Sequence, residues 1–450
     1  MSMDWNQLLC AERLGKDGKP RPHDPARSEF RRDSDRLTFS TAFRRLQDKT
    51  QVFPLADNDY VRTRLTHSLE VSSVARSLGA RVGAEICQRH PELKSHGSEI
   101  GEIVAAAALA HDLGNPPFGH SGEDAIRHWF QTSAIADAAS TGLSAAQRSD
   151  IERYEGNAQG FRLITRLQMP DNPGGLELTH ATLGAFTKYP RESVVPETVK
   201  RGASAKKFGF FQSEREQFAS VAEHCGLLRR APDVAWWARH PLAFLVEAAD
   251  DICYRLVDFE DGFRVGELAY AEVRDAFLAL MPDEKRPKRL HEAHTDGRRV
   301  QILRAIAIGC AIDESAEVFL ENEAAILTGA FDRPLIEAGA NCEAWAAIQR
   351  RSIETIYATR RGVMIEAAGF EVLGGLLDVF VSALNALDAE PRRSAKLLHL
   401  VPAEYLGPGR RPDAEPYPRL LKILDYVSGM TDSYALELYK NVRGISLPGR

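Results

Sequence analysis

Apolar positions in this chain recur with the spacing of helices and rarely alternate as they would in strands. The stretch 103–110 is apolar and rich in alanine, and Gly114 with two prolines beyond it marks a stop, which predicts a buried helix. A second amphipathic helix is predicted from about Thr66, and a third over 242–258. The sequence has no internal repeat, heptad array or long alternating pattern. These features predict an all-α fold.

The same pattern divides the chain into three expected regions. Residues 1–61 are interpreted as a polar N-terminal arm with a basic helical segment, 62–265 as the core that carries the candidate chemistry, and 266–450 as a helical region packed on that core. A chain of 450 residues is too long for one small core. Basic side chains between Arg44 and Arg64 do not alternate with acids, which favours an anion site over a solvated helix face.

Composition and charge narrow the class of protein. The content of 44% hydrophobic and 27% charged residues is ordinary for a soluble globular protein. A net charge of −6 gives no overall attraction to nucleic acid or anionic membranes, so a polyanion site must be a local basic patch. The six cysteines are scattered without a C-x-x-C pair, as expected for reduced thiols. With no signal peptide and no uninterrupted apolar run long enough to span a bilayer, we expect a cytoplasmic protein without a membrane partner.

The candidate chemistry starts from the adjacent pair His111 and Asp112, which the pattern places in the last turn of the buried helix. Neighbouring residues on a helix point about 100° apart, so both side chains meet one object only if it lies close beneath the helix end. A cation suits that place, because the helix end gathers unpaired carbonyls and His with Asp can bind a divalent metal. The alternative is that His111 caps its own helix and Asp112 is solvated.

Two further side chains favour the metal. His67 leads an apolar stripe on the preceding helix, where a histidine is more often a hydrogen-bonded core residue. However, it follows the basic segment and precedes the His-Asp pair, and that order of signals is specific. Asp250 lies in a strongly apolar helix, where an unpaired buried carboxylate would be very costly. A metal ion is a suitable partner for it.

Other residues indicate proton transfer and anion binding. His120 and Glu123 are three apart at the opening of a helix, the spacing of a general acid/base and the carboxylate that orients it. Basic and aromatic residues are interleaved around Lys188-Tyr189 and Lys207, which suits phosphates and a stacked base. The alternative is that these residues line an interface between lobes.

Six segments together carry a family resemblance. They are Ala42-Phe-Arg-Arg-Leu-Gln47, Thr63-Arg-Leu-Thr-His67-Ser68, His111-Asp-Leu-Gly-Asn-Pro-Pro-Phe-Gly-His120, Glu155-Gly-Asn157-Ala-Gln159, Ala249-Asp-Asp-Ile252 and Ser428-Gly-Met-Thr-Asp432. With them the chain resembles the HD-domain metal-dependent phosphohydrolases and, more narrowly, the bacterial deoxyguanosinetriphosphate triphosphohydrolases. The resemblance extends from the arm to the C-terminus, and its motifs are less specific for which nucleotide is cut.

That resemblance implies an all-α protein with an HD-domain catalytic core over 62–265 and an additional C-terminal helical region. It implies hydrolysis of deoxynucleoside triphosphates, dGTP and other dNTPs, to deoxynucleoside and intact triphosphate by attack of water at the α-phosphorus. The implied ligands of a divalent metal are His67, His111, Asp112 and Asp250, and His120 with Glu123 would move the proton. Manganese or magnesium is the expected ion, and iron, cobalt, nickel or zinc are further candidates.

The resemblance also implies the substrate contacts and partners. Gln51, and Asp258 together with Tyr254, would meet the sugar, where an aromatic ring leaves no space for a 2′-hydroxyl. The side chains implied to grip phosphates are Arg64, Asn157, Lys188, Tyr189 and Lys207. A homo-oligomer, a hexamer in the family, is expected, and single-stranded DNA is a further candidate partner.

Two other functions stay open at this point. An HD-domain enzyme for a nucleoside monophosphate or cyclic nucleotide would use the same four ligands, with less need of the basic segments. A nucleic-acid-binding regulator with a structural metal is the second alternative. It leaves the presence of His120 and Glu123 beside the metal unexplained.

Overall fold

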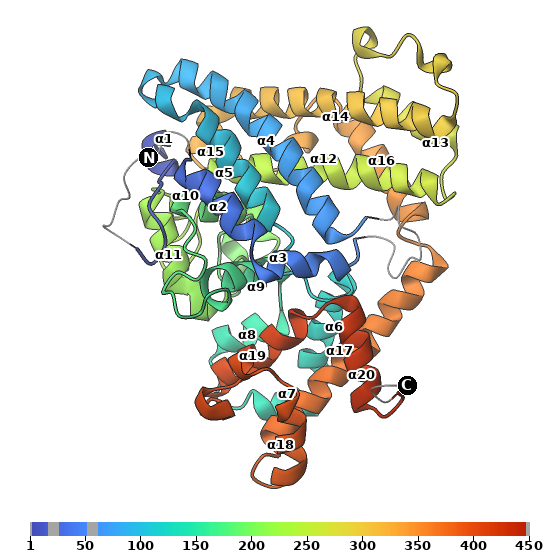
Figure 1. Cartoon of the computed structure of the whole chain (residues 1–450). Coiled ribbons are helices and arrows are strands. Elements are labelled where there is room, and N and C mark those ends of the chain that lie inside the picture. Colours follow the sequence, from blue (N-terminus) through green and yellow to red (C-terminus); the bar gives the residue numbers. More distant parts are fainter. Residues whose placement is uncertain (1, 17–26, 52–61, 447–450) are drawn as a thin grey trace.

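The computed structural model describes residues 2–16, 27–51 and 62–446, and these residues form a bundle of helices (Figure 1). Over these ranges no strand is present, and the β-bridges are isolated pairs such as Thr50 with Thr63. The predicted all-α fold is confirmed. Residues 52–61, which follow the expected basic helix, lie outside the described residues.

The helices follow the chain in the order shown by the labels of Figure 1. Their bounds are α1 (Trp5–Leu8), α2 (Glu29–Thr38), α3 (Thr41–Arg45), α4 (Arg64–Arg89), α5 (Gly97–Ala110), α6 (Gly119–Thr132), α7 (Ala134–Ala139), α8 (Ala145–Glu152), α9 (Gly156–Arg162), α10 (His180–Phe186), α11 (Arg215–His224), α12 (Pro241–Arg264), α13 (Tyr270–Ala279), α14 (Asp296–Glu321), α15 (Glu323–Leu327), α16 (Cys342–Thr355), α17 (Arg360–Asn385), α18 (Pro391–His399), α19 (Pro416–Ser428) and α20 (Asp432–Val442).

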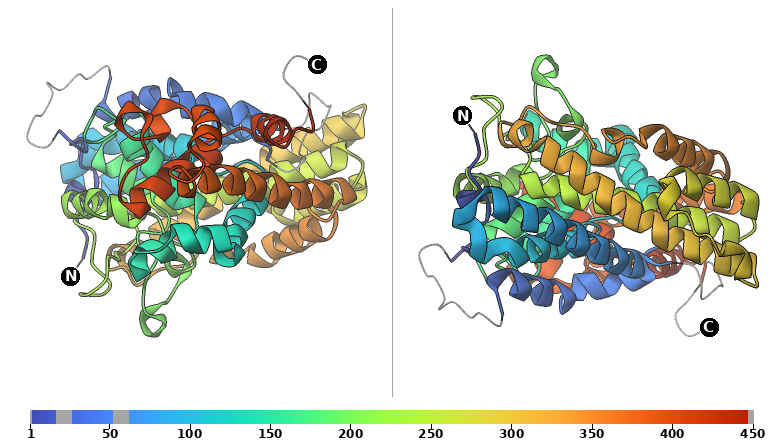
Figure 2. Two further views of the ribbon diagram at one scale, coloured as in Figure 1. Left: turned by 90° about the horizontal axis from the view of Figure 1, so that it is seen from below. Right: turned by 90° about the horizontal axis from the view of Figure 1, so that it is seen from above.

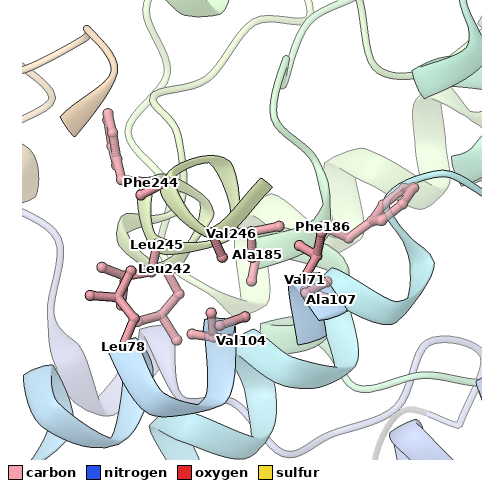
Figure 3. Packing of buried hydrophobic residues seen from close by; sticks show 14 of the residues in the cluster. Val71, Leu78, Val104, Ala107, Ala185, Phe186, Leu242, Phe244, Leu245 and Val246 are labelled. Atoms are coloured by element: carbon pink, nitrogen blue, oxygen red, sulfur yellow. The ribbon is translucent and has the colours of Figure 1, made fainter. Parts of the chain in front are cut away.

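A first hydrophobic core lies where α4, α5 and α12 pack together, with α10 and α14 beside them. Figure 3 shows Leu78 of α4, Val104 of α5 and Leu242 of α12 turned toward one another, and all three are fully buried. Small residues let α4 and α5 approach closely. A Cβ on Gly79 would lie only 2.9 Å from the Cα of Gly101. This contact fixes the two helices that carry the candidate histidines.

A second hydrophobic core lies in the lower part of Figure 1, where α17, α19 and α20 pack against α6, α7 and α8. The body of α6 belongs to this second core, while Gly119 and His120 at its opening line a cavity together with His67 and Asp250. Figure 2 shows the red and orange C-terminal helices crossing the face of the molecule seen from below. The junction of the two cores is where the candidate site lies.

One helix among the described residues, Gly362–Asn385, is long and apolar enough to cross a membrane by length and composition alone. Its most apolar window is 56% buried within the protein. Leu373, Leu376 and Phe380 on this helix are fully buried in the second core. The apolar side chains in the second half of this helix are thus used for packing between helices, while Val363, Met364 and Phe370 in its first half are exposed.

The N-terminal region contributes to the core, although the sequence analysis expected a polar arm there. Trp5 is 2% exposed, and its indole N–H donates a hydrogen bond of 2.9 Å to Glu323. Leu8 and Phe30 are also buried in the first core. Helix α1 has only four residues, too few for a period of 3.6 to be visible in the sequence.

Two helix ends differ from their predicted positions. Helix α4 begins at Arg64, because Thr63 caps it and Thr66 completes a reciprocal capping box. Helix α5 ends at Ala110, so His111 is the residue that follows the helix and not part of its last turn. Each shift is of one to three residues and leaves the candidate ligands on the expected elements.

A buried ion-pair cluster joins the two halves of the chain. The guanidinium of Arg162 donates to both carboxylate oxygens of Asp425 at 2.8 Å and to Glu214 at 2.7 Å. Gln159 donates to the same Asp425 carboxylate at 2.8 Å. Asp425 and Glu214 are at most 1% exposed. Removal of one member would leave an uncompensated charge in the interior.

We therefore expect Asp425→Ala to lower the free energy of unfolding by about 3 to 5 kcal/mol, measured by urea denaturation followed by circular dichroism. Arg148→Ala is the control, because Arg148 pairs with Asp137 and Glu152 at the surface, where such pairs contribute less than about 1 kcal/mol. Equal free energies of unfolding for Asp425→Ala and the wild type would contradict a stabilising role of this ion-pair cluster.

Candidate metal and substrate site

Three helices bring two imidazoles and a carboxylate to one point. His67 comes from α4, His111 follows α5, and Asp250 lies in the middle of α12. The Nε2 atom of His67 lies 3.2 Å from Oδ1 of Asp250, and that of His111 lies 3.5 Å from the same oxygen. One ligand atom from each residue lies within 4.8 Å of the others. Two ligands bound to one ion at about 2.1 Å are separated by at most about 4.2 Å, so the two measured separations suit a shared cation.

The hydrogen bonds of these residues also fit a metal. Nδ1 of His111 lies 2.7 Å from the carbonyl oxygen of Ala108, and a carbonyl only accepts, so Nδ1 carries the proton. Nε2 of His111 is then the ring atom left to bind a metal; it lies 3.5 Å from Oδ1 of Asp250 and is buried without a hydrogen bond among the described residues. Burial by itself would raise the pKa of Asp250, but the two histidines hold it well below its usual range. The site thus favours the ionised form of the Asp250 carboxylate, the form that binds a divalent cation.

Asp112 lies beside this cluster and is engaged by other groups. Its Oδ2 is 2.9 Å from a guanidinium nitrogen of Arg64, and its Oδ1 accepts a hydrogen bond from Asn115. Oδ1 also lies 3.6 Å from Nε2 of His111. Although burial would raise the pKa of Asp112, Arg64 and the histidines lower it. Three of the four expected ligands are gathered, and the fourth lies adjacent with its carboxylate paired to Arg64.

His120 stands at the first turn of α6 and lines both cavities of the site. The preceding Phe118 and Gly119 have φ values of 63° and 61°, the left-handed region that a residue other than glycine adopts at a cost. Displacement of water lowers the pKa of His120, and the charges of Arg64 and Lys207 act in the same direction.

Glu123 is 2% exposed and influences His120 through its charge. Within the described residues no hydrogen bond joins the two side chains, and Glu123 instead accepts from the backbone N–H of Gly156 at 2.7 Å. It also accepts from Lys207 at 3.2 Å and from Arg127. Its negative charge raises the pKa of His120, opposing the other effects. That Glu123 orients the imidazole directly stays a prediction.

The first cavity has a volume of about 290 Å³ and opens beside His67 and His120. Gln51 and Tyr254, two of the residues expected at the sugar, line it. Asp258 does not line it. The hydroxyl of Tyr357 donates to Asp258 at 2.8 Å, and the ring of Tyr357 stacks on Tyr254 with centroids 5.6 Å apart.

Tyr357 is a cavity residue that the sequence analysis did not identify. It lies between α16 and α17, 99 residues after the aspartate that it contacts, and no local pattern marks it. Burial raises the pKa of Asp258 to about 7, although His67 and the Tyr357 hydrogen bond lower it. The three side chains form one wall, with the aromatic pair in front of the carboxylate.

The second cavity, of about 170 Å³, is lined by two lysines together with the carboxylates of Asp112, Glu123, Glu247 and Asp250. Its lysines are held by buried glutamates: Lys188 lies 3.3 Å from Glu247, and Lys207 lies 3.1 Å from Glu155. Burial alone would lower the pKa of Lys207, but the carboxylates raise it. The cavity also receives Asn157 and Tyr189, so four of the five expected phosphate contacts line it. The fifth, Arg64, lines the first cavity.

Most basic side chains of the N-terminal segment contact other parts of this chain and do not line the cavities. Arg45 donates to the carbonyl of Gly429 at 3.0 Å, and Lys49 donates to the carbonyl of Asn115 at 2.6 Å. Arg62 pairs with acidic side chains of α4 and α12. Of the bases between Arg44 and Arg64 that the structure describes, only Arg64 lines the site. The expected anion patch is thus reduced to that residue, because buried carbonyls and carboxylates take the others.

An all-helical fold with paired histidines and a carboxylate at the meeting point of three helices defines the class of HD-domain proteins. The sequence matches the HD domain family over residues 64–151 and the phosphohydrolase-associated domain family over residues 340–441. A deoxyguanosinetriphosphate triphosphohydrolase-like protein of Synechocystis is 47% identical, covering 99% of this chain and 100% of the relative. A protein of the same name from Pseudomonas aeruginosa is 41% identical with the same coverage.

A deoxyguanosinetriphosphate triphosphohydrolase of Yersinia pestis is 31% identical over 92% of this chain and 93% of the relative. This chain belongs to the deoxyguanosinetriphosphate triphosphohydrolase-like family. The resemblance noted in the sequence is confirmed over nearly the full length.

The cluster geometry predicts which carboxylate holds the metal. The purified Asp250→Ala variant should retain little Mn²⁺ after dialysis, because a lost ligand leaves less charge to offset dehydration of the ion. The matched control is Asp251→Asn, the neighbouring carboxylate, which is not part of the three-residue cluster. Metal content by elemental analysis decides, and full Mn²⁺ occupancy of Asp250→Ala would contradict the assignment.

Proposed function

We propose that this protein hydrolyses deoxynucleoside triphosphates, dGTP among them, to deoxynucleoside and inorganic triphosphate. The observation that carries the proposal is the position of His120, which lines both a cavity with aromatic side chains and a second cavity with two lysines, and both cavities include Asp250 of the candidate metal cluster. A nucleoside and a triphosphate chain would occupy these two cavities. The α-phosphorus that joins them would then lie beside the cluster.

The proposed metal ligands are His67, His111 and Asp250, with Asp112 as the fourth. A bound divalent ion would supply Lewis acidity toward a phosphate oxygen and orient the substrate. The nitrogen and oxygen donors suit Mn²⁺ or Mg²⁺ and would also accept iron, cobalt, nickel or zinc. The pairing of Arg64 with Asp112 supports a role for Arg64 close to the reacting phosphate.

The second cavity offers two lysines to a polyanion within a protein of net charge −6, and four carboxylates line it as well. We assign Lys188, Lys207, Asn157 and Tyr189 to the phosphates, with Arg64 from the other side. Because each lysine is already charged and held by a glutamate, little rearrangement would be needed when phosphate oxygens approach. Positive charge preorganised in this way would stabilise the negative charge of the transition state.

The aromatic cavity suits the deoxynucleoside. We assign Gln51 and Tyr254 to the sugar, with Asp258 held behind them by Tyr357. Asp258 would meet a 3′-hydroxyl through its other carboxylate oxygen, since Tyr357 occupies only Oδ2. The stacked rings form a flat wall that limits the space around the sugar.

His120 is assigned as the group that transfers the proton, with Glu123 adjusting its charge. We further propose a cytoplasmic enzyme that assembles as a homo-oligomer, with the hexamer of the family as the expected form and single-stranded DNA as an additional partner. The family membership supports the oligomer and the DNA partner.

The products test the proposed reaction. Incubation of the purified protein with each deoxynucleoside triphosphate and Mn²⁺ should release inorganic triphosphate and deoxynucleoside, identified by phosphorus NMR and chromatography. Pyrophosphate with a monophosphate, or free phosphate with a diphosphate, would contradict cleavage between the α-phosphorus and the deoxynucleoside. Turnover of only a monophosphate or a cyclic nucleotide would favour another HD-domain activity.

Variants of the proton-transfer pair test the role of His120. His120→Ala should keep the metal and lose roughly 10²- to 10⁴-fold in kcat, the usual worth of general acid–base catalysis. Glu123→Gln should move the limb of the kcat profile that reports His120 to lower pH, because the lost negative charge had raised the pKa of His120. A metal-free His120→Ala protein would make His120 a ligand, and an unshifted profile for Glu123→Gln would remove Glu123 from this role.

A further inference from the structure

A single carboxylate from the C-terminal region connects two walls of the first cavity. Asp432 is the first residue of α20 and is 2% exposed. Its Oδ2 accepts the backbone N–H of Thr50 at 3.0 Å, and its Oδ1 accepts the backbone N–H of Phe118 at 3.0 Å. Thr50 and Phe118 both line the cavity. The two segments are far apart in sequence and are joined here through the same side chain.

Each of the two N–H groups belongs to a residue that lies one or two positions before a residue with a proposed role. Thr50 is followed by Gln51, which lines the sugar cavity, and Phe118 is followed after one glycine by His120. Phe118 adopts the left-handed conformation and caps α6 without a side-chain hydrogen bond. A backbone held in that conformation needs an outside partner to fix it. The Asp432 carboxylate is that partner.

Neighbouring contacts support a rigid link. Lys49 is 4% exposed, and its ammonium group donates to the carbonyl of Asn115 at 2.6 Å and of Ser428 at 3.0 Å. Burial lowers the pKa of Lys49 to about 7, and the charge of the nearby Asp432 carboxylate opposes that shift. Arg45 makes a similar contact with Gly429. The turn between α19 and α20 is thus tied to the segments on both sides of the cavity.

We propose that Asp432 is a positioning residue that sets His120 and Gln51 relative to each other across the cavity, and so makes the associated C-terminal domain a part of the active-site architecture. The helix-capping alternative does not explain both contacts, because Thr431 already caps α20 through its side chain. This inference rests on the roles proposed above for His120 and Gln51.

Asp432→Asn is the test, because it keeps the size of the side chain and removes one of the two acceptors. The amide nitrogen would face a backbone N–H, two donors in contact. We expect an unchanged metal content and an unchanged far-UV circular dichroism spectrum. The kcat should fall roughly 10²-fold because the proton-transfer group is misplaced, and KM should rise because Gln51 is misplaced. Ser433→Ala is the matched control, since its hydroxyl joins the same two regions at Asp48, outside the cavity, at 2.9 Å. It should keep wild-type kcat and KM.

A double variant separates positioning from stability. If Asp432 acts on kcat through His120, the pair His120→Ala with Asp432→Asn should have the kcat of His120→Ala alone. If the factors by which the two substitutions lower kcat multiply in the double variant, the inference is overturned. It is also overturned if Asp432→Asn has wild-type kcat and KM while His120→Ala is impaired. Both outcomes leave the proposed function intact. Full activity of His120→Ala would instead refute the role of His120, and with it any action of Asp432 through that residue.

A measurement on the wild-type holoenzyme covers the case in which Asp432→Asn does not fold. Hydrogen exchange should show the amides of Thr50 and Phe118 strongly protected, although neither lies inside a helix. Exchange as rapid as that of exposed loop amides would overturn the inference without any variant.

Discussion

The meeting of His67, His111 and Asp250 is the interaction on which the rest of this structure depends. A carboxylate and two imidazoles lie together here, with His67 buried and Asp250 partly exposed, and they compensate one another's charge only because their three helices approach closely. The contact of Gly79 with Gly101 permits that approach. The apolar packing shown in Figure 3 then holds the helices in place. Close packing and charge compensation therefore support each other.

The candidate site lies at the boundary between two hydrophobic cores. Helix α6 opens beside the charged cluster, while its body packs with α17 in the second core. Any shift between the cores would move His120 away from the cluster. The buried contacts of Arg162 with Asp425 and of Asp432 with two cavity walls cross this boundary. They explain why an associated domain far along the chain is packed against the HD domain.

Charge is arranged locally in a protein that is acidic overall. Lys188 and Lys207 stand in a small cavity, and buried glutamates hold each of them. Burial without these carboxylates would favour the neutral amines. The paired arrangement preserves positive charge in the cavity to which we assign the triphosphate. The acidic net charge and a polyanionic substrate are therefore compatible.

The sequence alone determined the helical class and the elements that carry the candidate ligands, because both follow from local spacing, as with Asp250 on its apolar helix. Only the tertiary structure decided what each charged or polar side chain meets. Lys49 belonged to a basic run, yet its ammonium group binds two backbone carbonyls, and charge pattern cannot distinguish a carbonyl from a phosphate. Tyr357 and Asp432 meet partners 99 and up to 382 residues away, contacts that no local periodicity records. Such partners are selected by how the helices pack, which is a property of the whole chain.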